Sequence, residues 1–164
     1  MPLTDAQVIA AFGDPAPYVL QDGSIDSIWR TLILAPLELP APLPLSWDRQ
    51  HSVSRLMVHR RLVVPFRLAL EAVHADAEAW ASLGDTGGCY AWRARRGSKR
   101  PSRHGWAIAI DLDVLDNPDG AVSKMHPRVI AAFENNGFEW AGRWSKKERD
   151  PMHFEFVDLA RLAA

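Results

Sequence analysis

The 164-residue chain has a formal net charge of −1, with 48% hydrophobic and 24% charged residues. This is the composition of a soluble globular protein, and the length predicts one domain over residues 1–164. The balanced charge argues against nucleic acid as a partner, because binding to phosphates rests on an excess of lysine and arginine. The single cysteine, Cys89, excludes an internal disulfide, and no apolar run reaches the roughly 18 residues of a membrane span.

The first half of the chain predicts two helical segments around a proline-rich connection. TDAQVIAAFG, residues 4–13, predicts a helix with a capping box of Thr4 and Gln7 and a stop at Gly13. SIDSIWRTLIL, 24–34, is typical of the entry to a strand, and the four prolines of 35–47 predict an extended surface loop. Residues 54–85 predict mostly helix, with Pro65 in its first turns and Gly84 beyond its end. Its apolar face is Leu62, Phe66, Leu70 and Val73.

The second half predicts a small sheet. CYAWRARRG, 89–97, AIAIDLD, 107–113, and MHFEFVDL, 152–159, have strand-like patterns, and HPRVIAAFENNGF, 126–138, predicts a short helix. Helices and strands do not alternate regularly. The predicted fold class is therefore α+β, with a central antiparallel sheet flanked by helices.

Two short motifs carry the chemistry. Asp111 ends a buried strand, where an unpaired carboxylate is costly, and His104 stands just before that strand. The same two residues could instead be a core histidine that is hydrogen-bonded to a carboxylate for structural reasons. The second motif, DPMHFEF, places Asp150 three residues before His153. Together His104, Asp111 and His153 would supply two nitrogens and one oxygen and leave a fourth position open, as in a catalytic zinc site.

The two motifs in this order resemble the M15 family of zinc peptidases, in particular its D-alanyl-D-alanine carboxypeptidase and phage L-alanyl-D-glutamate endopeptidase branch. The family pattern is S-x-H, small residues and A-x-D, followed later by an acidic residue, x, x and H. The matching positions are Ser102, His104, Ala109, Asp111, Asp150 and His153. The resemblance covers about residues 85–157 and implies the zinc D,D-peptidase (Hedgehog-like) fold. Ala107 departs from it, because the family usually has glycine there.

The resemblance also implies roles for individual residues. His104, Asp111 and His153 would hold one Zn²⁺, and Asp150 would be the general base. Arg93 would polarise the scissile carbonyl or stabilise the oxyanion. Ser102 would contact substrate or brace His104, Tyr90 is a candidate substrate contact, and Glu155 is a candidate to orient a ligand histidine.

The implied function is hydrolysis of a stem-peptide amide bond at a D-amino acid in peptidoglycan, as by a monomeric phage or prophage endolysin. The amino terminus lacks a basic and apolar signal peptide, so we expect synthesis in the cytoplasm and action on the wall after release. Alternatives are a D,D-carboxypeptidase or dipeptidase, and a zinc-containing wall-binding module without catalysis. The basic stretch RARRGSKRPSR, 93–103, is interpreted mainly as a solvated loop, with nucleic-acid binding as a weaker alternative.

Overall fold

The structure, a computed structural model, describes residues 1–95 and 97–162 and has one six-stranded sheet in the order β2-β1-β3-β4-β6-β5. The strands are β1 Leu34–Leu45, β2 Asp48–His59, β3 Thr86–Gly88, β4 Ala109–Leu112, β5 Phe138–Trp140 and β6 His153–Phe156. All pairings are antiparallel except that of β1 with β3, which is parallel. The α+β class is therefore confirmed, but the sheet is mixed and not wholly antiparallel. The Hedgehog-like type stays a prediction.

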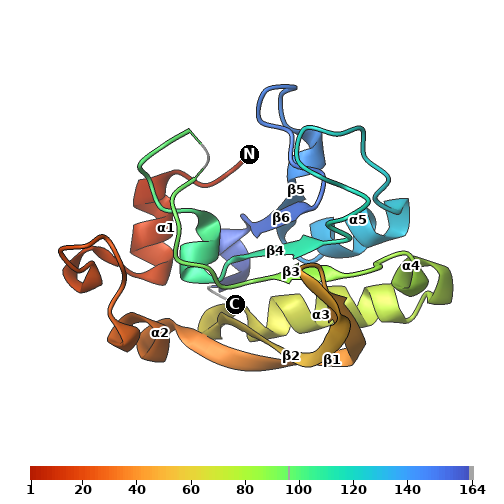
Figure 1. Ribbon diagram of the computed structural model, residues 1–164, viewed down its shortest axis with the longest axis horizontal. Helices are drawn as coiled ribbons and strands as arrows, with labels where there is room; N and C mark the ends of the chain where they lie inside the picture. Colours follow the sequence, from red (N-terminus) through yellow and green to blue (C-terminus); the bar gives the residue numbers. More distant parts are fainter. Residues whose placement is uncertain (96, 163–164) are drawn as a thin grey trace.

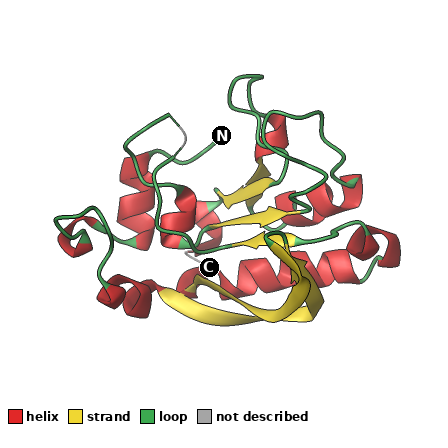
Figure 2. Ribbon diagram, viewed as in Figure 1, coloured by secondary structure: helices red, strands yellow, loops and turns green. Residues whose placement is uncertain are grey.

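Helices lie around this sheet, with α1 and α2 towards one end and α4 and α5 towards the other (Figures 1 and 2). Their bounds are α1 Asp5–Phe12, α2 Ser27–Ile33, α3 Val63–His74, α4 Ala77–Ala81 and α5 Pro127–Glu134. The predicted apolar face of 54–85 is confirmed, since Leu62, Phe66, Leu70 and Val73 are all buried. Within the described residues, no helix is both long and apolar enough to cross a membrane.

The prediction of a proline-rich surface loop at 35–47 was wrong, because most of this segment is strand β1. Proline lacks an N–H for a sheet ladder, so a strand tolerates it best along an edge or at a bulge. β1 meets β3 only at Leu45, which leaves most of that side of the strand without a ladder. On the other side, the register with β2 breaks between Glu38 and Leu43, where Pro40 and Pro42 lie.

Several other boundaries differ from the sequence-based expectations. Residues 27–33 are helix α2 and not strand, because the Asp26 side chain caps the helix by accepting from the Ile28 amide. Residues 54–59 belong to strand β2, so the helix begins only at Val63. The strand expected at 89–97 lies earlier, as β3 over 86–88, and Arg96 of that prediction falls outside the described residues. Strand β5 was not predicted.

His59 joins this framework to the N-terminal helix and makes the stability of the fold pH-dependent. It is 3% exposed, its Nδ1 accepts from the Arg61 amide, and its Nε2 lies 3.3 Å from the Phe12 carbonyl oxygen. A neutral ring satisfies both contacts, whereas a second proton would face the Arg61 N–H. Burial is the main reason that the pKa of His59 falls from 6.5 to about 4.

A His59→Gln variant tests this coupling. Below pH 6.5 His59 is protonated in the unfolded chain, whereas in the folded protein it stays neutral down to about pH 4. The free energy of unfolding therefore falls as the pH falls from 6.5 to 4. Between pH 7.5 and 5.0 we expect the wild type to lose about 2 kcal/mol more unfolding free energy than the variant. Urea unfolding at the two pH values measures the difference. Equal losses would show that His59 titrates normally.

Candidate active site

Three segments place the predicted metal ligands next to one another. His104 lies in the 3-10 helix η3 (Arg103–Trp106). The buried Ser102 side chain is the N-cap of this helix, because its hydroxyl accepts from the His104 amide at 3.4 Å. Asp111 on β4 and His153 on β6 are direct antiparallel partners in the sheet register. Opposite residues in such a pair project their side chains to the same face, so the register itself brings carboxylate and imidazole together.

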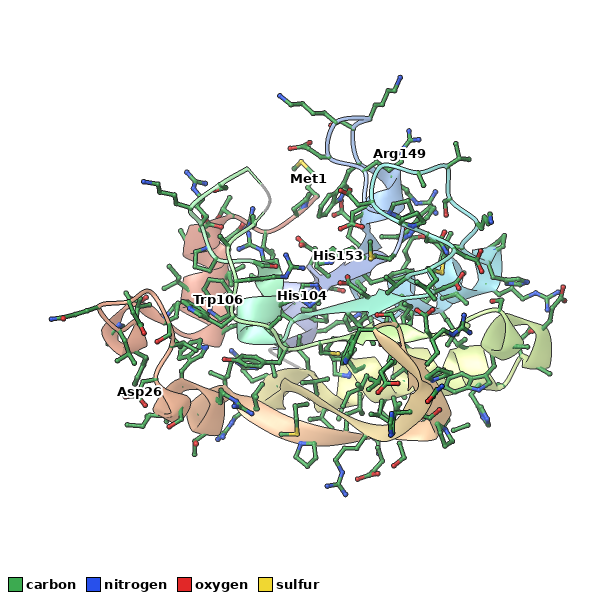
Figure 3. The ribbon with its side chains drawn as sticks, in the orientation of Figure 1. Met1, Asp26, His104, Trp106, Arg149 and His153 are labelled. Atoms are coloured by element: carbon green, nitrogen blue, oxygen red, sulfur yellow. The ribbon has the colours of Figure 1, made fainter. Side chains whose placement is uncertain are left out.

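The three side chains converge on one point of the fold, where Figure 3 shows His104 and His153 side by side. The Nε2 atom of His104 lies 3.3 Å from Nδ1 of His153 and 3.2 Å from Oδ2 of Asp111. Oδ1 of Asp111 is 2.9 Å from Nδ1 of His153. One ligand atom from each residue lies within 4.8 Å of the other two. Two imidazoles and a carboxylate at this spacing form a donor set suited to a mononuclear metal ion.

Neighbouring groups fix which ring nitrogen faces the centre. Nδ1 of His104 lies 2.9 Å from the Cys89 carbonyl oxygen, which only accepts, so Nδ1 carries the proton and Nε2 is left for a metal. Nε2 of His153 lies 3.3 Å from the carboxylate of Glu155, which is 3% exposed, and this leaves Nδ1 for the metal. This contact is compatible with the predicted orienting role of Glu155, which stays a prediction. Such outer hydrogen bonds raise metal affinity.

The electrostatics of the cluster favour a bound cation. Burial alone would raise the pKa of Asp111, but His104 and His153 outweigh it and hold that pKa well below its usual value. Burial likewise favours neutral His153, yet hydrogen bonds to Asp111 and Glu155 raise its pKa to about 10. The ionised Asp111 is thus ready to act as a ligand. A metal ion that binds here takes the place of the proton on His153.

The strand beside Asp111 leaves room for its carboxylate. A Cβ built on Gly87 of β3 would lie 2.9 Å from Cβ of Asp111 and 3.6 Å from its Oδ2. Contacts of 2.9 Å are closer than side chains tolerate, so any larger residue at this position would push Asp111 away from the two histidines. Gly87 therefore sets the position of the carboxylate ligand without touching the site through a side chain.

The backbone at Ala107 shows why glycine suits this position, where the sequence departs from the family pattern. Ala107 ends η3 in the left-handed region, at φ 53° and ψ 38°, a conformation that glycine adopts without strain. Alanine costs about 1–2 kcal/mol there, since its Cβ approaches the following carbonyl oxygen. The residue is fully buried, its carbonyl accepts from the His59 amide, and it is not part of the cleft wall. The substitution therefore affects the turn and not the shape of the cleft.

A cleft of about 370 Å³ opens at Asp111 and His153, with His104 buried behind them, and most of the other predicted residues line it. Asp150, Arg93, Ser102 and Glu155 all line it together with Asp111 and His153. Asp150 lies on the turn before β6, where its carbonyl accepts from the His153 amide at 3.1 Å. Tyr90 is not brought to this cleft. Its ring packs on the hydrophobic core beneath the Arg30 guanidinium, and a substrate contact at Tyr90 stays a prediction.

Several other cleft residues were not predicted, among them Trp144, Asp119, Arg95 and Arg103. The Trp144 ring centre lies 5.9 Å from that of His153, and its indole N–H donates to Glu139 at 2.9 Å. Asp119, Arg95 and Arg103 also line the cleft. Of these, only the arginines had a signal in the sequence, as part of the basic stretch, and no pattern distinguished the cleft-facing ones from the rest.

A largely buried cluster of two histidines and one carboxylate, beside a cleft that a further carboxylate lines, could hold a metal ion for hydrolysis. The family model described as D-alanyl-D-alanine carboxypeptidase, a family of M15 peptidases, matches residues 96–156 of the chain. This segment contains the three converging side chains and Asp150. The match confirms the resemblance to the M15 peptidases and supports a peptidase activity.

Proposed function

We propose that this protein is a zinc-dependent peptidoglycan hydrolase that cleaves a stem-peptide amide bond at a D-amino acid, as an endolysin of the L-alanyl-D-glutamate endopeptidase type. The observation that carries the proposal is the convergence of His104, Asp111 and His153 at a cleft that Asp111, His153 and Asp150 line. A site that only bound a metal for structural reasons would be closed by a fourth protein ligand and would need no base beside it.

The residues divide the work of hydrolysis. Zinc, when held by the three ligands, would lower the pKa of a water molecule and polarise the substrate carbonyl. Asp150 accepts the proton of the attacking water and returns it to the leaving amine, so the amide C–N bond is exchanged for a C–O bond. Arg93, exposed at the rim of the cleft, donates to the oxyanion that develops on the carbonyl. Glu155 and the Cys89 carbonyl keep the two histidines aimed at the metal.

A D,D-carboxypeptidase is the second candidate function, and the description of the matching family favours it. Both candidates use the same zinc chemistry and differ in the bond that the cleft accepts. A zinc-containing wall-binding module is the non-catalytic alternative, and the presence of Asp150 and Arg93 along the cleft argues against it. As part of the proposal, the protein acts as a monomer on the bacterial wall after release from the cytoplasm.

Digestion of purified peptidoglycan of several chemotypes tests the proposal, with mass spectrometry of the released fragments. We expect fragments with a new amino terminus at D-Glu, formed with added zinc and suppressed by a chelator. Release of free D-Ala would identify the carboxypeptidase instead. If no product forms although the protein holds one zinc per chain, the peptidase proposal is wrong and the binding module replaces it.

A further inference from the structure

The basic stretch 93–103 is held against the N-terminal helix by one carboxylate. Oδ1 of Asp5 accepts from Arg103 at 2.9 Å and from Arg95 at 3.0 Å, and Oδ2 lies 3.3 Å from Arg100. The three guanidinium groups outweigh the partial burial of Asp5 and hold its pKa below the usual value. These arginines are thus not simply solvated, as the sequence indicated, but share a common counter-ion about 90 residues away in the chain.

The described residues on the two sides of position 96 pair as the arms of a short hairpin. Ala94 bridges to Pro101, the Arg95 amide donates to the Arg100 carbonyl at 2.8 Å, and the Ser102 amide donates to the Arg93 carbonyl at 2.9 Å. In Figure 1 this loop rises beside α1 (the green segment near the N-terminus). Arg103, only 4% exposed, ties the end of the loop to the Leu3 carbonyl. Asp5 therefore lies at the joint between the hairpin and the N-terminal segment.

The hairpin presents positive charge to the cleft. Arg93, Arg95 and Arg103 line the cavity from this side, whereas the loops after β4 and β5 contribute three acidic residues and one basic residue: Asp119, Glu148, Asp150 and Lys147. Burial and the nearby Arg95 lower the pKa of Arg103, whereas Glu155 and Asp5 favour its charge. Oδ1 of Asp5 accepts from both arginines. Arg95 is 37% exposed, so its guanidinium can meet a ligand in the cleft while Asp5 holds it.

The two candidate substrates share an anion at one position. In a D,D-carboxypeptidase substrate, the residue after the scissile bond carries the terminal carboxylate. In an L-alanyl-γ-D-glutamyl peptide, D-Glu continues the chain through its γ-carbonyl, so its α-carboxylate is free. In both, a carboxylate lies one carbon from the nitrogen of the scissile amide. An arginine in the wall of the cleft matches such a group in charge and in geometry.

We infer that Arg95 binds the free α-carboxylate of the residue that follows the scissile bond, and that Asp5 is the positioning residue that holds Arg95 for this contact. The inference rests on the proposed function for the class of substrate, a stem peptide. It assigns a recognition role to the N-terminal helix and to the arginines of the hairpin. It also selects against peptides in which this carboxylate is amidated.

The test compares two peptides that differ at one group, L-Ala-γ-D-Glu-L-Lys and its analogue with the D-Glu α-carboxylate converted to the amide. Binding is measured by calorimetry on zinc-loaded Asp150→Ala protein, so that neither peptide is consumed. We expect the acid to bind about 10-fold tighter than the amide, as for a charge-assisted hydrogen bond. Each further substitution is made in the Asp150→Ala protein. Arg95→Gln should abolish the preference for the acid, and Asp5→Asn should abolish most of it. Asp5→Glu, which keeps the carboxylate, should keep the preference.

Arg100→Gln is the matched control, because Arg100 also contacts Asp5 but is 72% exposed and does not line the cleft. It should leave the preference unchanged. Hydrogen exchange gives a readout independent of any ligand: the amides of Arg95 and Ser102 should exchange faster in Asp5→Asn, while zinc content stays the same.

Equal affinity for the acid and the amide in the starting protein would overturn the inference, as would a preference that survives Arg95→Gln. A preference unaffected by Asp5→Asn would remove the positioning role. These outcomes can be distinguished from a failure of the proposed peptidase function. A wild-type protein that cleaves stem peptides without preferring the acid refutes only this inference, whereas one that prefers the acid but cleaves neither peptide nor peptidoglycan refutes only the peptidase.

Discussion

Replacement of Asp150 by alanine is expected to lower kcat by about 100- to 10,000-fold, the usual contribution of a general base, and to leave metal content unchanged. The reason is the division of roles in the cleft. His104, Asp111 and His153 converge on the metal position, whereas Asp150 lines the cavity from the turn before β6. In the proposed mechanism its carboxylate moves a proton and does not hold the ion.

Stem-peptide hydrolysis and zinc content, measured on the same preparation, give both halves of this result. Glu148→Ala is the control, because Glu148 is another carboxylate of the same loop that lines the cleft. It should keep kcat within about 3-fold, as for a residue outside the proton path. An Asp150→Ala protein that turns over normally would exclude the assigned base, and one that loses its zinc would make Asp150 a ligand.

Removal of a proposed metal ligand should lower the zinc content as well as the activity. In His104→Ala we expect zinc affinity to fall by more than the roughly 10- to 100-fold lost when a residue that only hydrogen-bonds a ligand is replaced, with activity lost in parallel. The physical reason is that His104 supplies one of three ligand atoms from a buried position, and no other side chain of the described cluster replaces it.

Because His104 is 2% exposed, a loss of fold has to be separated from a loss of ligand. Asp111→Asn is a second variant that preserves volume and removes the anionic ligand, and both proteins are compared by circular dichroism. His51→Ala controls for histidine removal as such, since the His51 side chain is 73% exposed and contacts Asp48. Full zinc occupancy in folded His104→Ala would show that the ligand set is wrong.

The candidate site could be predicted largely because its chemistry lies in two short segments. His104 and Asp111 flank a strand, and His153 and Glu155 begin another, so the order and types of side chain were visible along the chain. The register that pairs Asp111 with His153 was not visible, although it is what brings the ligands together. Periodicity indicates which residues share a strand face, but not which strands become neighbours.

The residues that sequence reasoning missed or misplaced depend on long-range contacts. Trp144 has no motif, and only the turn after β5 places it beside His153. Tyr90 lies near the arginine stretch in sequence, but its ring packs against the hydrophobic core. Asp5 is a common first-turn acidic residue, whose three arginine partners come from the middle of the chain. Such pairings require the tertiary fold.

The errors in secondary structure have local causes. Proline content argued for a loop at 35–47, but β1 keeps one side almost free of a ladder and its register breaks at the prolines. Strand β3 is only three residues long, and two of them are glycines, so no propensity indicated it. One of these glycines, Gly87, is required by the close approach of Asp111.

The most direct test of this account is a crystal structure of zinc-loaded protein with anomalous diffraction collected at the zinc edge. The account predicts one anomalous peak per chain, bounded by Nε2 of His104, Nδ1 of His153 and the Asp111 carboxylate, with water as the remaining ligand and Asp150 outside the coordination sphere. No peak at this position, or a peak whose fourth ligand is a protein side chain, would contradict a catalytic zinc centre.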